Sequence, residues 1–485
     1  MRRFAPVQRI LGLLLMLFSI SMLPPALVGL YYGDGAVAAF LIGFAITAGA
    51  GLVIWLPVMR NRAELRLRDG FLVVVLFWTV LGLFGAVPFL MSERPDMSVH
   101  DAVFESVSGL TTTGSTVLSG IENLPHAIRW YRQQLQWLGG MGIIVLAVAI
   151  LPMLGIGGMQ LYRAETPGPM KDTKLTPRIT ETAKALWYLY LGLTIACALG
   201  YWAAGMEAFD AIGHAFSTVA IGGFSTYDAS MGHFFDRPMI EVVAIIFMLL
   251  SGMNFALHFL AWRSRSVRPY TGDAEWRTYL LVLGVSATVT VLYLWWAGVF
   301  ADPTTAALHG VFQAVSIGTT TGFTTEAFYI WPGFLPVMLI FTSFIGGCAL
   351  STGGGMKVIR FLLLVKQGAR ELKRIIHPNA VIPIKIGNKA LPYRVVDAVW
   401  GFFSVYIAVF VVLMLILLFM GLDQVTAFSA VAATLNNLGP GLGEVGAHFA
   451  DIPDAAKWFL SLAMVLGRLE IFTLLVLFTA TYWRK

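Results

Sequence analysis

The sequence predicts an all-α polytopic membrane protein that contains four repeats of span, pore helix and span. Three observations support this fold class. Hydrophobic residues make up 58% of the 485 residues and charged residues only 12%, with a mean hydropathy of +0.76. Ten apolar stretches are long enough to cross a bilayer, and one short motif recurs four times between them. A charged share about half that of soluble domains excludes a soluble, disordered, collagenous or coiled-coil chain.

Each apolar stretch is expected to form a span of roughly 20 residues or more. Arg2 and Arg3 before the first stretch, and Ala36-Val37-Ala38 after it, also resemble a secretory signal with its cleavage site. That stretch is longer than a signal core and a second one follows within a few residues, so a membrane span is favoured. The expected spans are about 11–31, 37–59, 71–91, 134–155, 185–205, 239–261, 278–300, 334–365, 396–420 and 457–482.

The cations indicate the orientation of the chain in the membrane. With the N-terminus inside, 26 of the 33 Lys and Arg residues fall in segments on the cytoplasmic side. Lys357 and Arg468 lie within apolar sequence. Both termini are therefore expected in the cytoplasm, and the net charge of +6 is explained without a nucleic-acid partner. The cations assigned to the outer side are Arg94, Arg129, Arg132, Arg237 and Lys457.

A glycine-containing turn recurs between the spans, each time after a short apolar segment. Aligned on the last glycine of each turn, the copies are 109, 99 and 117 residues apart. Four chance turns are the alternative, but the copies occupy matching positions between spans. The turns are Thr112-Thr113-Gly114, Ile221-Gly222-Gly223, Thr320-Thr321-Gly322 and Asn437-Leu438-Gly439.

The residue types in these turns suit a bare monovalent cation. A short helix that re-enters the membrane is tolerated only where it lines a water-filled cavity. Glycine adopts positive φ and allows backbone carbonyls to face an axis, where they replace the hydration shell of an ion. The C-terminal ends of the short helices add negative partial charge. The turns contain no carboxylates, which divalent ions usually require.

A second glycine-rich segment predicts a break inside the expected span 334–365, at residues 346–357. Three consecutive glycines disfavour a helix by about 1 kcal/mol each, and an intramembrane loop must face a cavity. A gate below the turns is the favoured interpretation; glycines that pack helices are the alternative, and a phosphate-binding loop is disfavoured because Gly355 precedes Met356 rather than Lys. The candidate gate residues are Gly346, Gly347, Gly353, Gly354, Gly355, Lys357 and Arg468.

The two intramembrane cations have alternative roles. Arg468 is expected to face the pore, where it would repel cations, although pairing with Glu470 or with filter carbonyls is the structural alternative. Lys357 could instead extend to the cytoplasmic face. Cys197 and Cys348 lie in apolar stretches, so no disulfide framework is expected.

Taken together, these motifs resemble the Trk/Ktr/HKT superfamily of cation transporters, in particular its bacterial Trk-type potassium uptake subunits. The resemblance rests on Thr-Thr-Thr-Gly, Ala-Ile-Gly-Gly-Phe-Ser-Thr, Thr-Thr-Thr-Gly-Phe-Thr-Thr and Asn-Asn-Leu-Gly-Pro-Gly, with Gly-Gly-Cys-Ala-Leu-Ser-Thr-Gly-Gly-Gly and Gly-Arg-Leu-Glu. It implies potassium uptake across the bacterial inner membrane, pseudo-fourfold symmetry around one pore, and two extra N-terminal transmembrane helices. The implied domains are 1–69 for the extra helices and 70–180, 181–276, 277–392 and 393–485 for the repeats.

The resemblance also implies a homodimer, contact with membrane lipids and a cytoplasmic nucleotide-binding regulatory ring, TrkA. It assigns the filter carbonyls to the four turns and the gate to the 346–357 loop with Arg468. K⁺ is the implied ion, Rb⁺ is expected to pass by size, and no organic cofactor is expected on this chain. No turn contains Thr-Val-Gly-Tyr-Gly, so the strictness of selection against Na⁺ stays open.

Two other functions fit the sequence less well. A secondary active transporter, such as a cation symporter with a midplane site, also uses broken helices, but usually with inverted repeats. An enzyme is disfavoured because the chain has no His-Glu-x-x-His, Cys-x-x-Cys or Gly-x-Ser-x-Gly motif. The basic segment 366–395 is expected to contact either a cytoplasmic regulator or anionic lipid headgroups.

Overall fold

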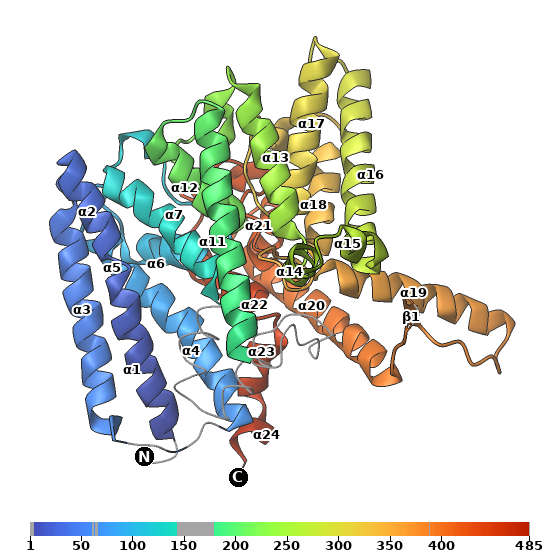
Figure 1. The fold of residues 1–485 in the computed structure, drawn as a ribbon, viewed down its shortest axis with the longest axis horizontal. Coiled ribbons are helices and arrows are strands. Elements are labelled where there is room, and N and C mark those ends of the chain that lie inside the picture. The colour runs from blue at the N-terminus through green and yellow to red at the C-terminus, as the bar shows by residue number, and fades with distance from the viewer. Residues whose placement is uncertain (1–3, 61–62, 64–65, 143–178, 388, 485) are drawn as a thin grey trace.

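The computed structural model describes residues 4–60, 63, 66–142, 179–387 and 389–484, and it is almost entirely helical (Figure 1). Within these residues, six helices are long and apolar enough to cross a membrane, or up to eight if each sharply bent helix pair is one span. The chain is therefore a multi-pass membrane protein, as predicted. Residues 143–155 of the predicted span 134–155 lie outside the described part of the chain.

Three helices form an N-terminal layer at the left of Figure 1, and short helix α2 continues α1 after a break at Ser21 and Met22. α1 and α3 pack closely because glycines face each other: a Cβ atom on Gly12 would lie 2.7 Å from the Gly51 carbonyl oxygen. The helices are α1 (Ala5–Ile20), α2 (Leu23–Tyr32) and α3 (Val37–Trp55).

The remaining helices follow the predicted order of span, short helix, turn and span. The first set is α4 (Leu67–Gly85), α5 (Val87–Met91), α6 (Val99–Leu110) and α7 (His126–Gly140). The second is α11 (Ile179–Ala203), α12 (Ala208–Val219), α13 (Pro238–Gly252), α14 (Phe255–Ser264) and α15 (Arg268–Gly272). The third is α16 (Ala274–Trp296), α17 (Pro303–Gly318), α18 (Leu335–Ile345) and α19 (Val358–Ile376). The fourth is α20 (Tyr393–Phe419), α21 (Gln424–Leu435), α22 (Asp454–Arg468), α23 (Phe472–Leu475) and α24 (Ala480–Trp483).

A small hairpin connects α19 to α20 and projects with them from the body of the molecule, at the right of Figure 1. Its strands β1 (Lys385–Ile386) and β2 (Lys389–Ala390) are antiparallel, with Lys385 opposite Ala390. This pair was not predicted from the sequence. Short 3₁₀ turns occupy Leu56–Val58, Ile121–Asn123, Ser230–Phe234, Phe328–Ile330, Gly443–Val445 and Val476–Phe478.

Two spans that the sequence predicted as continuous are bent sharply. α13 and α14 meet at 94°, and α22 meets the helical segment 472–478 at 104°. The first break is stabilised locally, because the Asn254 side chain caps α14 by accepting from Ala256 N at 2.8 Å. At the second break, Glu470 and Ile471 both have positive φ. The predicted break in the span 334–365 is confirmed, with α18 and α19 separated by residues 346–357.

Helix α7 is polar and contains Arg129 and Arg132, two of the cations that the sequence assigns to the outer side of the membrane. Arg129 and Arg132 are buried, at 7% and 1% exposure, and three glutamines of the same helix are buried beside them. Such a helix avoids lipid because it packs between α6 and α12. Its polar side chains therefore make hydrogen bonds inside the protein rather than in water.

The first and last helices lie at the same end of the molecule, at the bottom of Figure 1. The rings of Phe4 and Trp483 are 6.2 Å apart, and Arg68 donates to the Arg484 carbonyl oxygen at 3.3 Å. This placement agrees with the even number of crossings predicted from the cations.

Candidate functional site

The four predicted turns have the same backbone geometry. In each, the first residue has positive φ although it is not glycine: 54° at Thr112, 55° at Ile221, 67° at Thr320 and 52° at Asn437. The closing glycines have φ of 84°, 77°, 84° and 106°. The middle residue of every turn donates its N–H to a carbonyl of the preceding helix at 2.8 Å. A strained, left-handed backbone at the same position of all four turns is typical of a functional site.

The turns contact one another in cyclic order. A Cβ atom on Gly114 would lie 2.1 Å from the Gly222 carbonyl oxygen. Gly223 faces the Thr321 carbonyl in the same way, Gly322 faces that of Leu438, and Gly439 faces that of Thr113. The turns therefore form a closed ring in which each glycine accommodates a carbonyl of its neighbour, and a side chain at these positions would collide with backbone.

Each turn follows the C-terminal end of a short helix, namely α6, α12, α17 and α21. The four helix ends direct their partial negative charge towards the ring. At the other end, Asp302 caps α17 and Asp423 caps α21. Hydrogen bonds from Thr304 lower the pKa of Asp302, and those from Thr426 lower the pKa of Asp423. Both carboxylates therefore stay ionised at the N-terminal ends of their helices, where a negative charge stabilises the helix dipole whose negative end lies at the ring.

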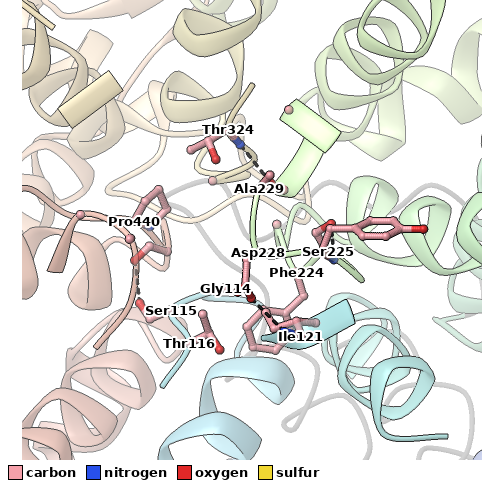
Figure 2. A pocket seen from close by; sticks show the side chains of 18 of the residues that line it. Gly114, Ser115, Thr116, Ile121, Phe224, Ser225, Asp228, Ala229, Thr324 and Pro440 are labelled. Atoms are coloured by element: carbon pink, nitrogen blue, oxygen red, sulfur yellow. Dashed lines mark hydrogen bonds between the residues drawn. The ribbon is translucent and has the colours of Figure 1, made fainter. Parts of the chain in front are cut away.

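A cavity of about 350 Å³ opens beyond the ring and is lined by all four closing glycines. Figure 2 shows its lining side chains around an open centre, contributed by segments from the four differently coloured parts of the ribbon. The lining contains the carboxylates of Asp228 and Glu326 and one cation, Arg132, whose charge is offset by buried Glu105, so the cavity favours cations. In the described part of the chain, no group of three or more His, Cys, Asp or Glu side chains could hold a metal ion.

The intramembrane loop, residues 346–357, lies against the opposite end of the ring. Gly354 donates its N–H to the Thr320 hydroxyl at 2.6 Å, and Gly355 donates to the Asn436 carbonyl at 3.0 Å. The Thr352 hydroxyl donates to the Val219 carbonyl at 2.9 Å. Of these partners, Thr320 belongs to the third turn, Asn436 directly precedes the fourth, and Val219 lies two residues before the second.

One carboxylate binds the chain both near the start of the loop and in the first turn of α19, directly after the loop. Glu275, at the start of α16, accepts from Ala349 N at 2.7 Å and from Ile359 N at 3.1 Å. Sequence reasoning missed this residue, since an acidic residue at the start of a helix is ordinarily read as favourable to the helix dipole.

The two intramembrane cations both contact the loop. Arg468 donates to the Thr352 carbonyl at 3.2 Å and to the Gly139 carbonyl at 2.8 Å. Lys357 is buried and its Nζ donates to the Gly353 carbonyl, so it does not extend to the membrane surface. Glu470 accepts from Arg360, whose guanidinium lies 4.0 Å from the centre of the Phe402 ring.

Helix α7 supports the ring from the side, which the sequence analysis did not predict. Arg132 donates to Glu105 at 2.7 Å and to the Ser225 carbonyl at 2.9 Å, and its guanidinium lies 4.2 Å from the Phe224 ring centre. Gln136 donates to the Gly222 carbonyl and accepts from Phe224 N. Two arginines and three glutamines within a span are the signal that could have identified this helix.

We expect Arg132→Met to destabilise the protein strongly. Glu105 is 0% exposed, so the substitution leaves a buried carboxylate without its counter-ion, which costs about 3–5 kcal/mol. The melting temperature of purified protein, followed by size-exclusion chromatography after heating, should fall by several degrees. Asp236→Asn is the control, because the exposed Arg237–Asp236 pair contributes about 0–1 kcal/mol. Equal melting temperatures for the two variants would contradict a stabilising role of the buried pair.

Comparisons with known proteins identify the family and agree with the overall fold. A family model described as TrkH, cation transport protein, matches residues 36–485. The Trk system potassium uptake protein TrkH of Vibrio parahaemolyticus is 61% identical over 485 residues, covering 100% of both chains. TrkH of Escherichia coli K12 is 57% identical over 482 residues, covering 99% of this chain and 100% of that one. A crystal structure of the potassium transporter TrkH from Vibrio parahaemolyticus superposes with a TM-score of 0.90 at 58% identity, covering 99% of this chain and 100% of that chain.

Proposed function

We propose, since this chain belongs to the TrkH family of cation transport proteins, that it takes up potassium across the bacterial inner membrane by channel-like permeation. The observation that carries the proposal is the closed ring of four glycine turns below a cation-favouring cavity. The family is one of transport proteins rather than enzymes. The four repeats are proposed to span 70–180, 181–276, 277–392 and 393–485 in pseudo-fourfold symmetry, with the N-terminal pair of transmembrane helices in 1–69.

The ring supplies the selectivity filter in this proposal. Carbonyl oxygens of the four turns replace the hydration shell of K⁺, and the four helix ends stabilise the dehydrated ion. Rb⁺, which is close to K⁺ in size, passes as well. The positive φ at the first residue of each turn supports this role, because it reverses the chain and changes the direction of successive carbonyls.

The intramembrane loop closes the pathway on the inner side of the filter. Its hydrogen bonds to Thr320, Asn436 and Val219 hold it against the ring. Arg468 adds a positive charge at the same level through its contact with Thr352. Opening then requires the loop to leave the ring.

Regulation is proposed to come from the cytoplasmic side. We assign the N- and C-termini to the cytoplasm, together with the projecting segment 366–395. That segment would contact the nucleotide-binding ring TrkA, or anionic lipid headgroups. The chain is proposed to work as a homodimer in which each subunit has its own pore.

The proposal is tested by rubidium-86 uptake into proteoliposomes that hold the purified protein with an inside-negative potential. We expect uptake that K⁺ inhibits at a lower concentration than Na⁺, with TrkA added where the loop keeps the protein closed. Uptake that stops when a proton or sodium gradient is collapsed at constant potential would instead support a cation symporter. Absence of uptake with and without TrkA would contradict potassium transport by this chain.

A further inference from the structure

We propose that Gln136 is a positioning residue that holds the second filter turn in shape and thereby helps to set the preference for K⁺ over Na⁺. The inference rests on the proposed function of the ring as the ion filter. It concerns a side chain of α7, outside the turns and outside the loop.

The second turn lacks the internal support of its neighbours. In the first turn, the hydroxyls of Thr111 and Thr113 are 2.7 Å apart and form a hydrogen bond. Thr319 and Thr321 form the same pair in the third turn, also at 2.7 Å. The second turn has Ala220 and Gly222 at these positions, so it contains no hydroxyl pair.

Gln136 occupies the space that a side chain at position 222 would fill. A Cβ atom on Gly222 would lie 2.4 Å from Cδ of Gln136 and 2.5 Å from its Oε1. The backbone of Gly222 is not in the left-handed region, in contrast to Gly223 with φ of 77°. Glycine at 222 is therefore explained by the glutamine that lies against it rather than by a special backbone conformation.

The amide of Gln136 holds the turn on both sides of Gly223. Its Nε2 donates to the Gly222 carbonyl at 2.5 Å, and its Oε1 accepts from Phe224 N at 3.0 Å. Gln133, three residues earlier and on the same face of α7, donates to the Phe224 carbonyl at 3.3 Å. Gln136 is fully buried, so no water competes for these bonds.

This support affects the ion because the Gly222 carbonyl belongs to the ring. Selection between alkali cations depends on the number, field strength and freedom of the coordinating carbonyls. A carbonyl held by an amide keeps its position, whereas a released carbonyl can move towards the smaller Na⁺. Loss of Gln136 should therefore weaken discrimination more than it weakens uptake.

The test is a double-mutant cycle in rubidium-86 uptake, with variants Gln136→Ala, Gly222→Ala and the pair. The readout is the ratio of the Na⁺ to the K⁺ concentration that halves uptake. We expect Gln136→Ala to lower this ratio about fivefold or more. Gly222→Ala alone should reduce uptake about tenfold, because its Cβ meets Gln136, yet it should cost little in the Gln136→Ala background.

Gln134→Ala is the matched control, because Gln134 lies on the same helix, is also buried, and bonds to the Ser21 carbonyl and Trp130 instead of the ring. It should leave the ratio unchanged and should not rescue Gly222→Ala. If Gln136→Ala is poorly folded, Gln136→Met, which keeps the side-chain length without the hydrogen bonds, replaces it.

A wild-type ratio in a folded Gln136 variant, or additive losses in the double variant, would overturn the inference. A wild-type protein that takes up no rubidium, even with TrkA, would instead contradict the proposed function.

Discussion

Gly322→Ala is expected to abolish rubidium uptake while the protein still reaches the membrane. The new Cβ atom would lie 2.0 Å from the Leu438 carbonyl oxygen, and Gly322 has φ of 84°. Both the third turn and its neighbour must then move, and the ring loses the geometry of its carbonyls. We expect uptake to fall by about a hundredfold or more, which corresponds to about 3 kcal/mol in the barrier. Uptake in proteoliposomes, normalised to protein recovered, measures the effect.

Gly421→Ala separates the two causes of a loss of uptake in Gly322→Ala, which are backbone strain and a collision in the ring. Gly421 also has positive φ, at 96°, but no atom would lie within 4 Å of its Cβ. Its substitution therefore imposes backbone strain without a collision in the ring, and uptake should stay within about twofold of wild type. Similar losses at positions 322 and 421 would show that the effect is general strain, and would remove support for the ring as the ion pathway.

A glycine-to-alanine substitution in the loop, Gly354→Ala, is expected to raise rubidium uptake rather than abolish it. A Cβ atom on Gly354 would lie 1.9 Å from the Asn436 carbonyl oxygen, so Gly354→Ala cannot keep the loop against the ring. The hydrogen bond from Gly354 to Thr320 is lost with it. We expect rubidium uptake without any regulatory partner to rise about tenfold, equivalent to about 1.4 kcal/mol in favour of the open loop. The measurement is the initial rate of uptake by the protein alone.

Gly368→Ala is the control for this gain. Gly368 lies within α19, and its Cβ would meet no atom within 4 Å. Alanine should stabilise that helix by about 1 kcal/mol without touching the loop, and the rate should not change. A loss of uptake in Gly354→Ala would argue against the loop as a gate if the ratio of the Na⁺ to the K⁺ concentration that halves uptake stays unchanged.

The turns could be predicted from the sequence because their chemistry is local. Gly114 and Gly322 sit in Thr-Thr-Thr-Gly, and a helix end followed by glycine specifies its own geometry. The break at 346–357 was predictable for the same reason, since Gly353, Gly354 and Gly355 disfavour a helix wherever they occur.

The missed features depend on partners that are distant in sequence. The bend after Gly252 is fixed partly by the Gly252 carbonyl accepting from Cys348 N, 96 residues later, at 2.8 Å. The role of Gln136 depends on its contact with the Gly222 carbonyl, which is 86 residues away in the sequence. Periodicity and composition describe one helix at a time, so they place Arg132 just before the predicted span 134–155 and cannot show its buried pairing with Glu105.

The single carboxylate at the base of the loop has a thermodynamic consequence. Because Glu275 binds the N–H groups of Ala349 and Ile359, the chain between them is already a closed cycle before it settles on the ring. The entropy of bringing its ends together has been lost in advance, so each return to the ring orders only a few residues. In the proposed gating, the tether therefore lowers the entropic cost of returning the loop to the ring, which favours rapid closure once a cytoplasmic regulator releases it.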